Sequence, residues 1–328
     1  MVTNGYHNAN PLMVHGATSS GSLPGECAGA PDRQRGPSLS IVIVTYNVSD
    51  LVIRCLQSVF ASEVSFGVEV IVIDAGTDGS GDRIRAEYPM VSVIQAPENP
   101  GFGTASNLGL RRSHGNYLLL LNPDTVIPPD ALALAVSDLE ANPSHGIVGP
   151  KLVRADGSLD LSARRSFPTP RIALYHFLGL PRRFPNVREF GAYNLTYLDP
   201  DQPATVDAVA GSFMMVRREA LEIAGLFDES FWMYGEDLDL CLRVGKAGWK
   251  ARYLPSIVVT HLKGQSSRTR PLRCTIEFYR AMHIFYLKHQ ASRAGVVQNF
   301  LVTTGIVALG AIAVLRDQLR PKAHRRVS

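Results

Sequence analysis

The sequence predicts an α/β protein built on a doubly wound, mostly parallel β-sheet. Apolar, β-branched runs such as Leu39–Thr45 lack the polar alternation of a half-exposed strand, as expected for parallel strands buried on both faces. These runs alternate with segments of helical periodicity, and the loops between them are short. With 328 residues, 45% of them hydrophobic, the chain is long enough to bury a large core.

The first half of the chain contains the clearest alternation. After the strand that begins at Leu39, Asp50–Phe60 has a helical pattern, and Val68–Asp74 is a second buried strand. A glycine-rich turn leads to a short helix at Asp82–Glu87, and Val91–Ala96 is the third strand. The remaining elements of this half are a helix at Thr104–Ser113, a strand at Tyr117–Leu121 and a helix at Pro129–Glu140, opened by Pro-Pro-Asp.

The second half is less regular. Arg164–Pro203 is rich in proline and aromatic residues and receives no assignment. Beyond it we expect a strand near Ser212–Val216, a helix at Arg218–Ala224, a helix that starts at Gly235 and a last strand at Tyr253–Thr260. The chain contains no internal repeat.

Composition excludes some classes of protein and favours a reducing compartment. The net charge is only +4, and much of the basic excess lies after Arg316, so the body lacks the dense basic face of a nucleic-acid binder. The four cysteines, Cys27, Cys55, Cys241 and Cys274, form no CxxC pair and no zinc-type cluster. Residues 1–37 contain no apolar run, so we expect a disordered leader rather than a signal peptide.

Polar side chains follow several of the predicted strands. Asn47, Asp74 and Asp124 come at carboxyl ends, where open α/β sheets bind their ligands. A carboxylate such as Asp124, fixed by Pro123 after a wholly apolar strand, can hold a hard divalent cation that neutralises a diphosphate. The alternative is that Asp124 only caps the turn and the following helix.

Asp74 allows two interpretations of similar weight. An acid at a strand end followed by Ala-Gly-Thr-Asp-Gly-Ser80 can hydrogen-bond nucleotide hydroxyls or base edges, since the glycines let the backbone approach closely. The alternative is a helix-capping loop in which Asp78 is an ordinary turn residue.

Glu236 and Asp237 open a helix after the aromatic run Phe231-Trp-Met-Tyr234. A general base for a sugar hydroxyl must be ionised at neutral pH, and a helix N-terminus favours the charged form. Simple compensation of the helix dipole is the more common reason for acids in a first turn. His261 directly follows the last predicted strand, where imidazole can join carboxylates around Mn²⁺ or Mg²⁺ or can be just a surface residue.

Taken together in this order, the motifs resemble the family 2 glycosyltransferases of the GT-A fold, especially the bacterial rhamnosyltransferase-like branch. The resemblance runs from about Ser40 to Ser267. It depends on the following segments: Ile-Val-Thr-Tyr-Asn47, Val-Ile-Asp74, Asn99-Pro-Gly-Phe-Gly103 with Asn107, Leu-Asn-Pro-Asp124, Gly211-Ser-Phe-Met-Met-Val-Arg217, Gly225-Leu-Phe-Asp228, Tyr-Gly-Glu-Asp237 and His261.

The resemblance implies roles for matching residues. Asp237 would be the general base, Glu236 its partner near the acceptor, and Asp124 and His261 the ligands of Mn²⁺ or Mg²⁺. Trp232 and Tyr234 are expected on the acceptor side, where sugars often meet aromatic faces. Contacts to the nucleotide-sugar are expected from Thr45, Asn47, Asp74, Gly103, Asn107, Asn122 and Asp124. The loop after Asp74 is one residue shorter than in relatives and lacks their asparagine.

The implied activity is metal-dependent, inverting transfer of a sugar from a nucleotide-diphosphate donor to a glycan or lipid-linked acceptor hydroxyl, in cell-envelope polysaccharide synthesis. dTDP-L-rhamnose is the favoured donor, with UDP-galactofuranose, UDP-hexoses or GDP-mannose as alternatives. A catalytically inactive scaffold is an alternative of another class, although the base and metal ligands are present. The sequence leaves the oligomeric state open.

The predicted domains are a leader at 1–37, a glycosyltransferase domain at 38–270 and a helical, membrane-associated region at 271–328. Within the glycosyltransferase domain, 38–150 would bind the nucleotide-sugar and 151–270 the acceptor. Ala294–Leu315 has no charge and is long enough to span a bilayer. Basic residues flank it on both sides, however, which disfavours a single crossing from a cytoplasmic catalytic domain. We therefore expect a helix in the cytoplasmic leaflet, with packing on the catalytic domain as the alternative.

Overall fold

The computed structural model describes residues 38–96, 98–262 and 271–319. The predicted leader 1–37 and the basic residues after Leu319 lie outside the described residues. The strands of the main sheet are β1 (Leu39–Thr45), β2 (Val68–Asp74), β3 (Ser92–Gln95), β4 (Tyr117–Leu121), β5 (Thr125–Val126), β6 (His145–Val153), β8 (Ala204–Val206), β10 (Phe213–Arg217) and β11 (Lys250–His261). The helices are α1 (Ser49–Phe60), α2 (Ser80–Glu87), α3 (Phe102–Leu110), α4 (Ala131–Ala141), α5 (Pro170–Phe177), α6 (Leu180–Arg183), α7 (Arg218–Ala224), α8 (Glu236–Lys246), α9 (Pro271–His289) and α10 (Val296–Leu319).

The main sheet is mixed but mostly parallel, in the order β3-β2-β1-β4-β10-β6-β11-β5, with β8 also pairing with β11. Strands β1 to β4 pair in parallel, and so do β6 and β11. Strand β10 runs antiparallel to both of its neighbours, β4 and β6. Two short strands, β7 (Arg164–Arg165) and β9 (Ala208–Val209), form a separate antiparallel pair. Strands from both predicted halves of the glycosyltransferase domain therefore share one sheet.

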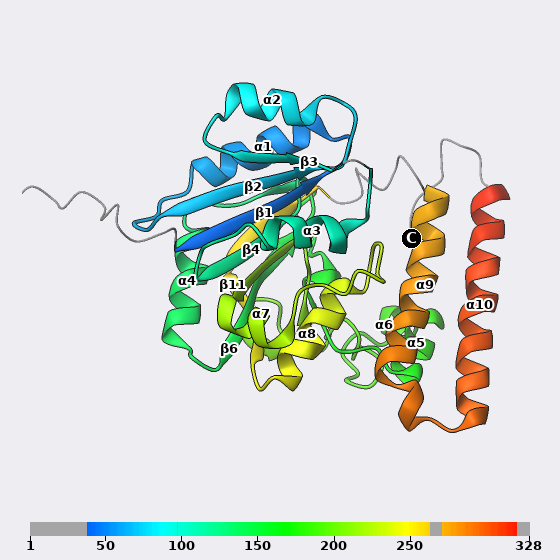
Figure 1. Cartoon of the computed structure of the whole chain (residues 1–328). Helices are drawn as coiled ribbons and strands as arrows, with labels where there is room; N and C mark the ends of the chain where they lie inside the picture. The colour runs from blue at the N-terminus through cyan, green and yellow to red at the C-terminus, as the bar shows by residue number, and fades with distance from the viewer. Residues whose placement is uncertain (1–37, 97, 263–270, 320–328) are drawn as a thin grey trace, which may run out of the picture.

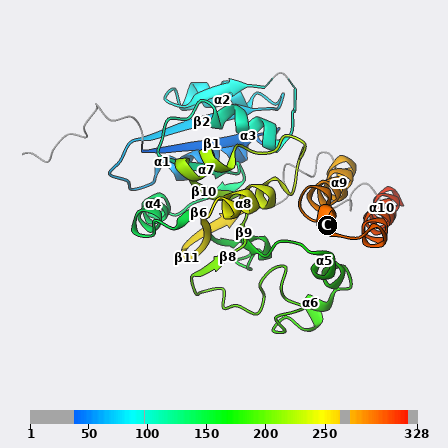
Figure 2. The ribbon, with the colours of Figure 1, turned by 60° about the horizontal axis from the view of Figure 1, so that its bottom comes forward.

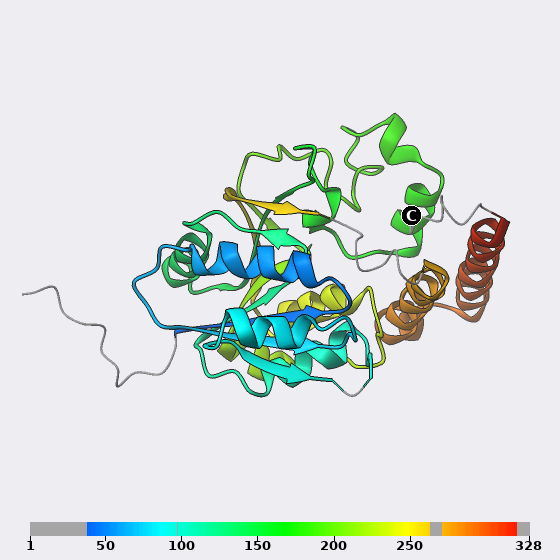
Figure 3. The same ribbon diagram turned by 90° about the horizontal axis from the view of Figure 1, so that it is seen from above.

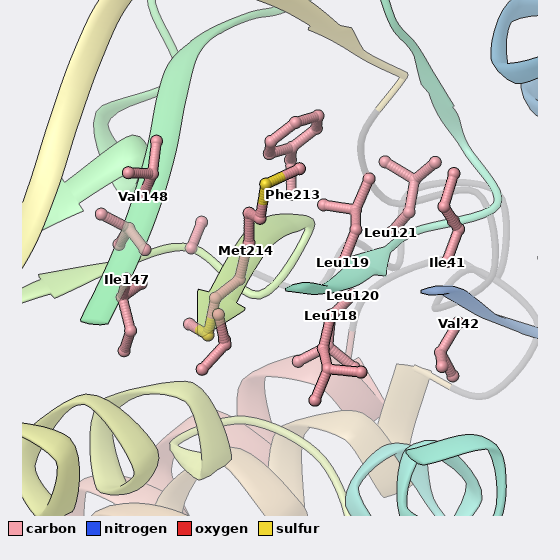
Figure 4. Close-up of a cluster of buried hydrophobic side chains, with 14 of the residues drawn as sticks. Ile41, Val42, Leu118, Leu119, Leu120, Leu121, Ile147, Val148, Phe213 and Met214 are labelled. Atoms are coloured by element: carbon pink, nitrogen blue, oxygen red, sulfur yellow. The ribbon is translucent and has the colours of Figure 1, made fainter. Parts of the chain in front are cut away.

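Helices cover both faces of the sheet. Helices α1 and α2 lie above it in the view of Figure 1, and α3, α7 and α8 lie on the opposite face (Figures 1 and 2). The central side chains alternate between the two layers: Leu119 and Leu121 point one way from β4, whereas Leu118 and Leu120 point the other way (Figure 4). On α3, a Cβ at Gly109 would lie only 2.5 Å from Val42, so the helix packs too closely on β1 for any larger residue.

The predicted strands at Val68–Asp74 and Tyr117–Leu121 and the helix at Arg218–Ala224 have the observed bounds. Strand β6 was not predicted, because Gly146, Gly149 and Pro150 interrupt its apolar pattern. The predicted helix at Thr104–Ser113 starts earlier and ends at Leu110.

Helices α9 and α10 form an antiparallel hairpin beside the sheet domain (Figures 1 and 3). The end of α9 is fixed to α8 because Lys288 Nζ and His289 Nε2 lie 2.8 and 2.7 Å from Asp239 Oδ1. Lys288 also pairs with Asp228, at 2.6 Å. Among the described residues, α10 is the one helix long and apolar enough to cross a membrane by length and composition, and only 6% of its apolar window is buried.

Candidate functional site

A histidine lies between two carboxylates at the carboxyl end of the sheet. Strand β5 pairs with the end of β11, with Thr125 opposite His261, and this pairing brings Asp124 beside the imidazole. His261 Nε2 is 3.3 Å from Asp124 Oδ1, and Nδ1 is 3.3 Å from Asp160 Oδ2. All three side chains are buried. The strand ends therefore meet as the sequence suggested, and Asp160 joins them.

The charge on His261 follows from these neighbours. Burial alone would lower the pKa of the imidazole, but hydrogen bonds to Asp124 and Asp160 outweigh it and raise that pKa to about 9. Because the two ring nitrogens face opposite ways, the carboxylates do not converge on one point. Consistent with this, no group of three or more His, Cys, Asp or Glu side chains within 38–96, 98–262 and 271–319 is arranged to hold a metal ion.

Asp237 begins the first turn of α8 and is held by three donors. Its Oδ2 accepts hydrogen bonds from Arg165 Nη2 at 2.6 Å and from the Gly211 backbone N–H at 3.1 Å. Its Oδ1 accepts from the Leu238 N–H at 2.8 Å. Arg165 is buried, and the adjacent charge of Asp237 raises its pKa against the opposing effect of burial. This pair fixes the orientation of the Asp237 carboxylate and places a positive charge beside it.

Glu236 contrasts with Asp237. It is buried, and its Oε2 has no hydrogen-bond partner. Burial, followed by the charge of Asp237, raises the pKa of this carboxyl well above its usual range. Glu236 is therefore the protonated member of the two neighbouring acids at neutral pH.

The aromatic run before α8 packs closely against the start of α3. Gly101, at φ +92°, lies so close to Trp232 that a Cβ there would be 2.3 Å from the Trp232 carbonyl oxygen, and the Phe102 N–H donates to the same oxygen at 2.8 Å. The Arg273 guanidinium lies 3.7 Å from the Trp232 ring centroid. Tyr234 takes a left-handed conformation, with φ 69°, as residues under local constraint often do at functional sites.

One cavity of about 1710 Å³ joins these groups. It extends from the ends of β1 and β4, past Asp124 and Asp160, to α8 and α9. Of the residues predicted from the sequence, the cavity is lined by Asn122, Asp124, Trp232, Tyr234, Glu236, Asp237 and His261. The structure therefore brings the predicted base, its partner, the predicted metal ligands and the acceptor-side residues together.

Five residues predicted to contact the nucleotide-sugar do not line this cavity: Thr45, Asn47, Asp74, Gly103 and Asn107. Asp74 accepts from the N–H groups of Gly76 and Gly81, at 2.9 and 2.8 Å, and thereby shapes the shortened loop. Asn47 fixes the same loop by accepting from the Thr77 N–H at 2.8 Å.

Asn107 and Gly103 belong to the packing of α3. Asn107 Nδ2 donates to the Phe227 carbonyl at 2.9 Å, and its Oδ1 accepts from the Phe227 N–H at 3.0 Å. A Cβ at Gly103 would lie 3.3 Å from the Phe231 carbonyl. Four of these five residues have supporting contacts, whereas the Thr45 hydroxyl is buried without a hydrogen-bond partner. Nucleotide contact remains a prediction for all five.

Asp160 and Arg165 were missed by sequence reasoning. Asp160 precedes a 3-10 helix, Leu161–Ala163, and its Oδ1 accepts from the Ser162 N–H at 3.0 Å. That Asp-Leu-Ser capping pattern was the only local signal, and it says nothing of His261. Arg165 lies on β7 within the segment that received no assignment, so no local pattern linked it to Asp237.

The chain resembles known proteins over most of its length. Residues 40–223 match the family model described as Glycosyl transferase family 2. An N-acetylglucosaminyl-diphospho-decaprenol L-rhamnosyltransferase of Mycobacterium tuberculosis is 30% identical over 88% of the chain and 96% of the relative. Rhamnosyltransferase WbbL of Escherichia coli K12 is 27% identical over 70% of the chain and 85% of the relative.

Solved structures show the same fold at low sequence identity. Mannosyltransferase PcManGT from Pyrobaculum calidifontis, in complex with GDP-Man and Mn²⁺, superimposes with a TM-score of 0.53, at 20% identity, over 87% of the chain and 74% of that structure. GalNAc-T7 with UDP, GalNAc and Mn²⁺ gives a TM-score of 0.52, at 17% identity, over 78% and 50%. The GT-A architecture expected from the sequence is thus confirmed.

Proposed function

Because the chain belongs to glycosyl transferase family 2, we propose that it transfers a sugar from a nucleotide-diphosphate donor to a lipid-linked glycan, with inversion, in cell-envelope glycan synthesis. L-rhamnose from dTDP-L-rhamnose is the favoured donor sugar, since two relatives are named rhamnosyltransferases. The observation that carries the proposal is the single cavity lined by Asp124, His261 and Asp237.

The proposed base is Asp237. An inverting transfer needs an ionised group that takes the proton of the attacking hydroxyl. The hydroxyl oxygen then bonds to the anomeric carbon while the bond from that carbon to the donor diphosphate breaks. Asp237 is fixed beside the cavity by Arg165 and Gly211, whereas the raised pKa of Glu236 keeps that neighbour protonated. Glu236 is therefore proposed as a hydrogen-bond donor to the acceptor side rather than as the base.

Without an ion, the raised pKa of His261 keeps the imidazole protonated toward Asp124, so a bound cation would displace the Nε2 proton. With that proton displaced, Asp124 and His261 fit a divalent cation. Two donors each about 2.1 Å from an octahedral ion lie about 3 Å apart when they are adjacent. The separation of Asp124 Oδ1 from His261 Nε2 is 3.3 Å. Mg²⁺ and Mn²⁺ commonly bind to one or two protein groups and to substrate phosphates, so we assign the remaining ligands to the donor diphosphate. The ion would supply positive charge that stabilises the leaving diphosphate.

Donor binding and metal dependence test this function directly. Full-length protein mixed with dTDP-L-rhamnose, UDP-galactofuranose, UDP-hexoses and GDP-mannose should be stabilised by one of them, by about 2.7 kcal/mol at 100 times its Kd. Transfer to a lipid-linked glycan should stop on addition of a chelator and return with excess Mn²⁺. Thermal shifts and product analysis measure both effects. Donor binding without transfer to any acceptor would instead favour the inactive scaffold, and full activity in chelator would contradict the metal assignment.

We also propose that the protein acts at the cytoplasmic face of a membrane, where α10 lies in the leaflet. The outward positions Val297, Phe300, Val307 and Leu315 are exposed and lie three, seven and eight residues apart, which is the spacing of one helix face. The opposite side packs on α9, where a Cβ at Gly310 would lie 3.2 Å from the Tyr279 Cβ. An apolar face of this length, with basic residues near both ends, suits the interface of an anionic bilayer.

The double substitution Val297→Glu with Val307→Glu should lower binding to phosphatidylglycerol-containing vesicles by at least about tenfold, because each buried valine contributes about 1.5 kcal/mol. Sedimentation with vesicles measures the bound fraction. The matched control is Met90→Glu with Ile223→Glu, since these side chains are 68% and 67% exposed, against 73% and 62% for the α10 pair. Equal loss in both variants, or none in either, would contradict the membrane role of α10.

A further inference from the structure

The cavity continues past the proposed catalytic residues into an apolar extension between α5, α9 and α10. Its total volume of about 1710 Å³ exceeds the roughly 300–1,000 Å³ of a typical pocket for one small molecule. We call this extension the helical channel. It is lined by Ala173, Leu174, Phe177 and Leu178 of α5 and its C-cap, by Phe278, Ala281, Met282 and Phe285 of α9, and by Leu301, Val302, Gly305, Ile306 and Leu309 of α10.

Helix α5 presents apolar side chains that the protein itself does not bury. None of its residues is buried, and Leu174, Phe177 and Leu178 are all exposed. Their spacing of three and four residues places them on one face. The channel-lining positions of α9 and α10 are likewise helical stripes of apolar residues. Three apolar stripes thus face a common space that adjoins the polar site.

Basic groups lie on the cavity wall or beside it, after β6 and at the starts of α5 and α9. Arg154 and Arg171 line the cavity and are exposed. Arg171 makes only a long contact with Glu189, at 3.5 Å. Arg273, at the start of α9, does not itself line the cavity but covers the ring of Trp232, which does. These guanidinium groups suit a phosphate or diphosphate placed between a polar and an apolar portion of one molecule.

We propose that the helical channel binds the isoprenoid chain of a diphosphate-linked acceptor, with the diphosphate at these arginines and the sugar hydroxyl toward Asp237. The inference rests on the proposed function and adds a site for the lipid. Positive charge on and beside the cavity wall, continuity of the cavity with Asp237, and the neighbouring exposed face of α10 favour this occupant. A peptide fits less well because its backbone polar groups would need partners that these apolar stripes do not supply.

Filling the channel tests the proposal. Gly305 lines the cavity and a Cβ there would have open space within 4 Å, so Gly305→Phe starts without backbone crowding and adds bulk to the channel. The matched control is Gly245→Phe, because Gly245 is also a helical glycine with open space around it but lies outside the cavity. Steady-state kinetics would use two acceptors with the same glycan diphosphate, one on a long isoprenoid chain and one on a short alkyl chain.

The expected result is a rise of at least about tenfold in KM for the long-chain acceptor in Gly305→Phe, with kcat and the short-chain KM unchanged. Gly245→Phe should behave as the wild type. An unchanged long-chain KM would overturn the proposal, and so would an equal loss with both acceptors. Leu178→Glu repeats the test, with Ile223→Glu as its control. The Leu178 and Ile223 side chains are 64% and 67% exposed, so neither change should affect folding much.

Binding without turnover separates this proposal from the proposed function. A polyisoprenyl diphosphate that carries a photoreactive group in its chain should crosslink to peptides of α5, α9 and α10, and Gly305→Phe should reduce that labelling. Labelling elsewhere, or equal competition by a plain fatty acid, would overturn the lipid site. Labelling of the channel in a protein that transfers no sugar would support the site while contradicting the glycosyltransferase function.

Discussion

The variant Asp237→Asn should lose about 10²-fold to 10⁴-fold in transfer rate while its affinity for the nucleotide-sugar stays close to that of the wild type. The change removes the base but keeps nearly the same shape and the acceptor oxygen that Gly211 and Arg165 contact. Single-turnover transfer measures the rate, and a thermal shift with the donor measures binding. An equal fall in both quantities would indicate damage to the site rather than loss of the base.

Glu236→Gln is the comparison that separates the two acids. A base with a raised pKa would be mostly protonated at neutral pH, so activity that depended on Glu236 would increase as the pH rises through its pKa. We expect Glu236→Gln to keep most of the transfer rate. Its pH–rate profile should be the same as that of the wild type. Normal turnover by Asp237→Asn would move the role of base to Glu236, because Asp239 is buried among its three basic partners and does not line the cavity.

The variant Asp124→Ala should lower Mn²⁺-dependent transfer by about 10²-fold to 10³-fold, the usual size of effect when one preorganised electrostatic contact is lost. Calorimetric titration with Mn²⁺ in the presence of donor should show weaker binding. Asp156→Ala is the control because Asp156 lines the same cavity but bonds to Ser158 rather than to His261. Retention of Mn²⁺-dependent activity by Asp124→Ala would show that the assignment is wrong.

Asp160→Asn distinguishes a ligand from a residue that orients one. Asp160 contacts the far nitrogen of His261, so its loss should weaken Mn²⁺ affinity by about 10-fold to 100-fold, less than the loss of Asp124. An Asp160→Asn effect as large as that of Asp124→Ala would place both acids on the ion.

The parts of the fold that the sequence predicts well are those with local causes. Strands β1, β2 and β4 are unbroken apolar runs because both of their faces are covered, and polar residues at their ends mark the edge where the site lies. Asp124 and His261 come together because both lie at that edge. Strand β6 was not predicted because glycine and proline interrupt its apolar pattern. Pairing with β11 stabilises the strand in spite of that weak local pattern.

The rest of the site depends on contacts between distant segments. Asp160 reaches His261 across 101 positions, and Arg165 reaches Asp237 across 72. The segment that holds Arg165 is ordered in part by Arg164, which donates to the carbonyls of Leu198 and Asp199 at 2.6 and 2.8 Å. No periodicity within that segment encodes these partners, so the sequence alone could not assign it.

The fixing of α9 to α8 changes how mutational scans of this turn should be interpreted. Asp239 is fully buried and bonds to Arg243 as well as to Lys288 and His289, so its loss leaves cations without their common carboxylate and detaches the hairpin. Asp237, two residues earlier, faces the cavity instead. Loss of either acid in this turn should therefore give an inactive protein, but for unrelated reasons. Protease sensitivity of α9 would separate an architectural loss at Asp239 from a chemical loss at Asp237.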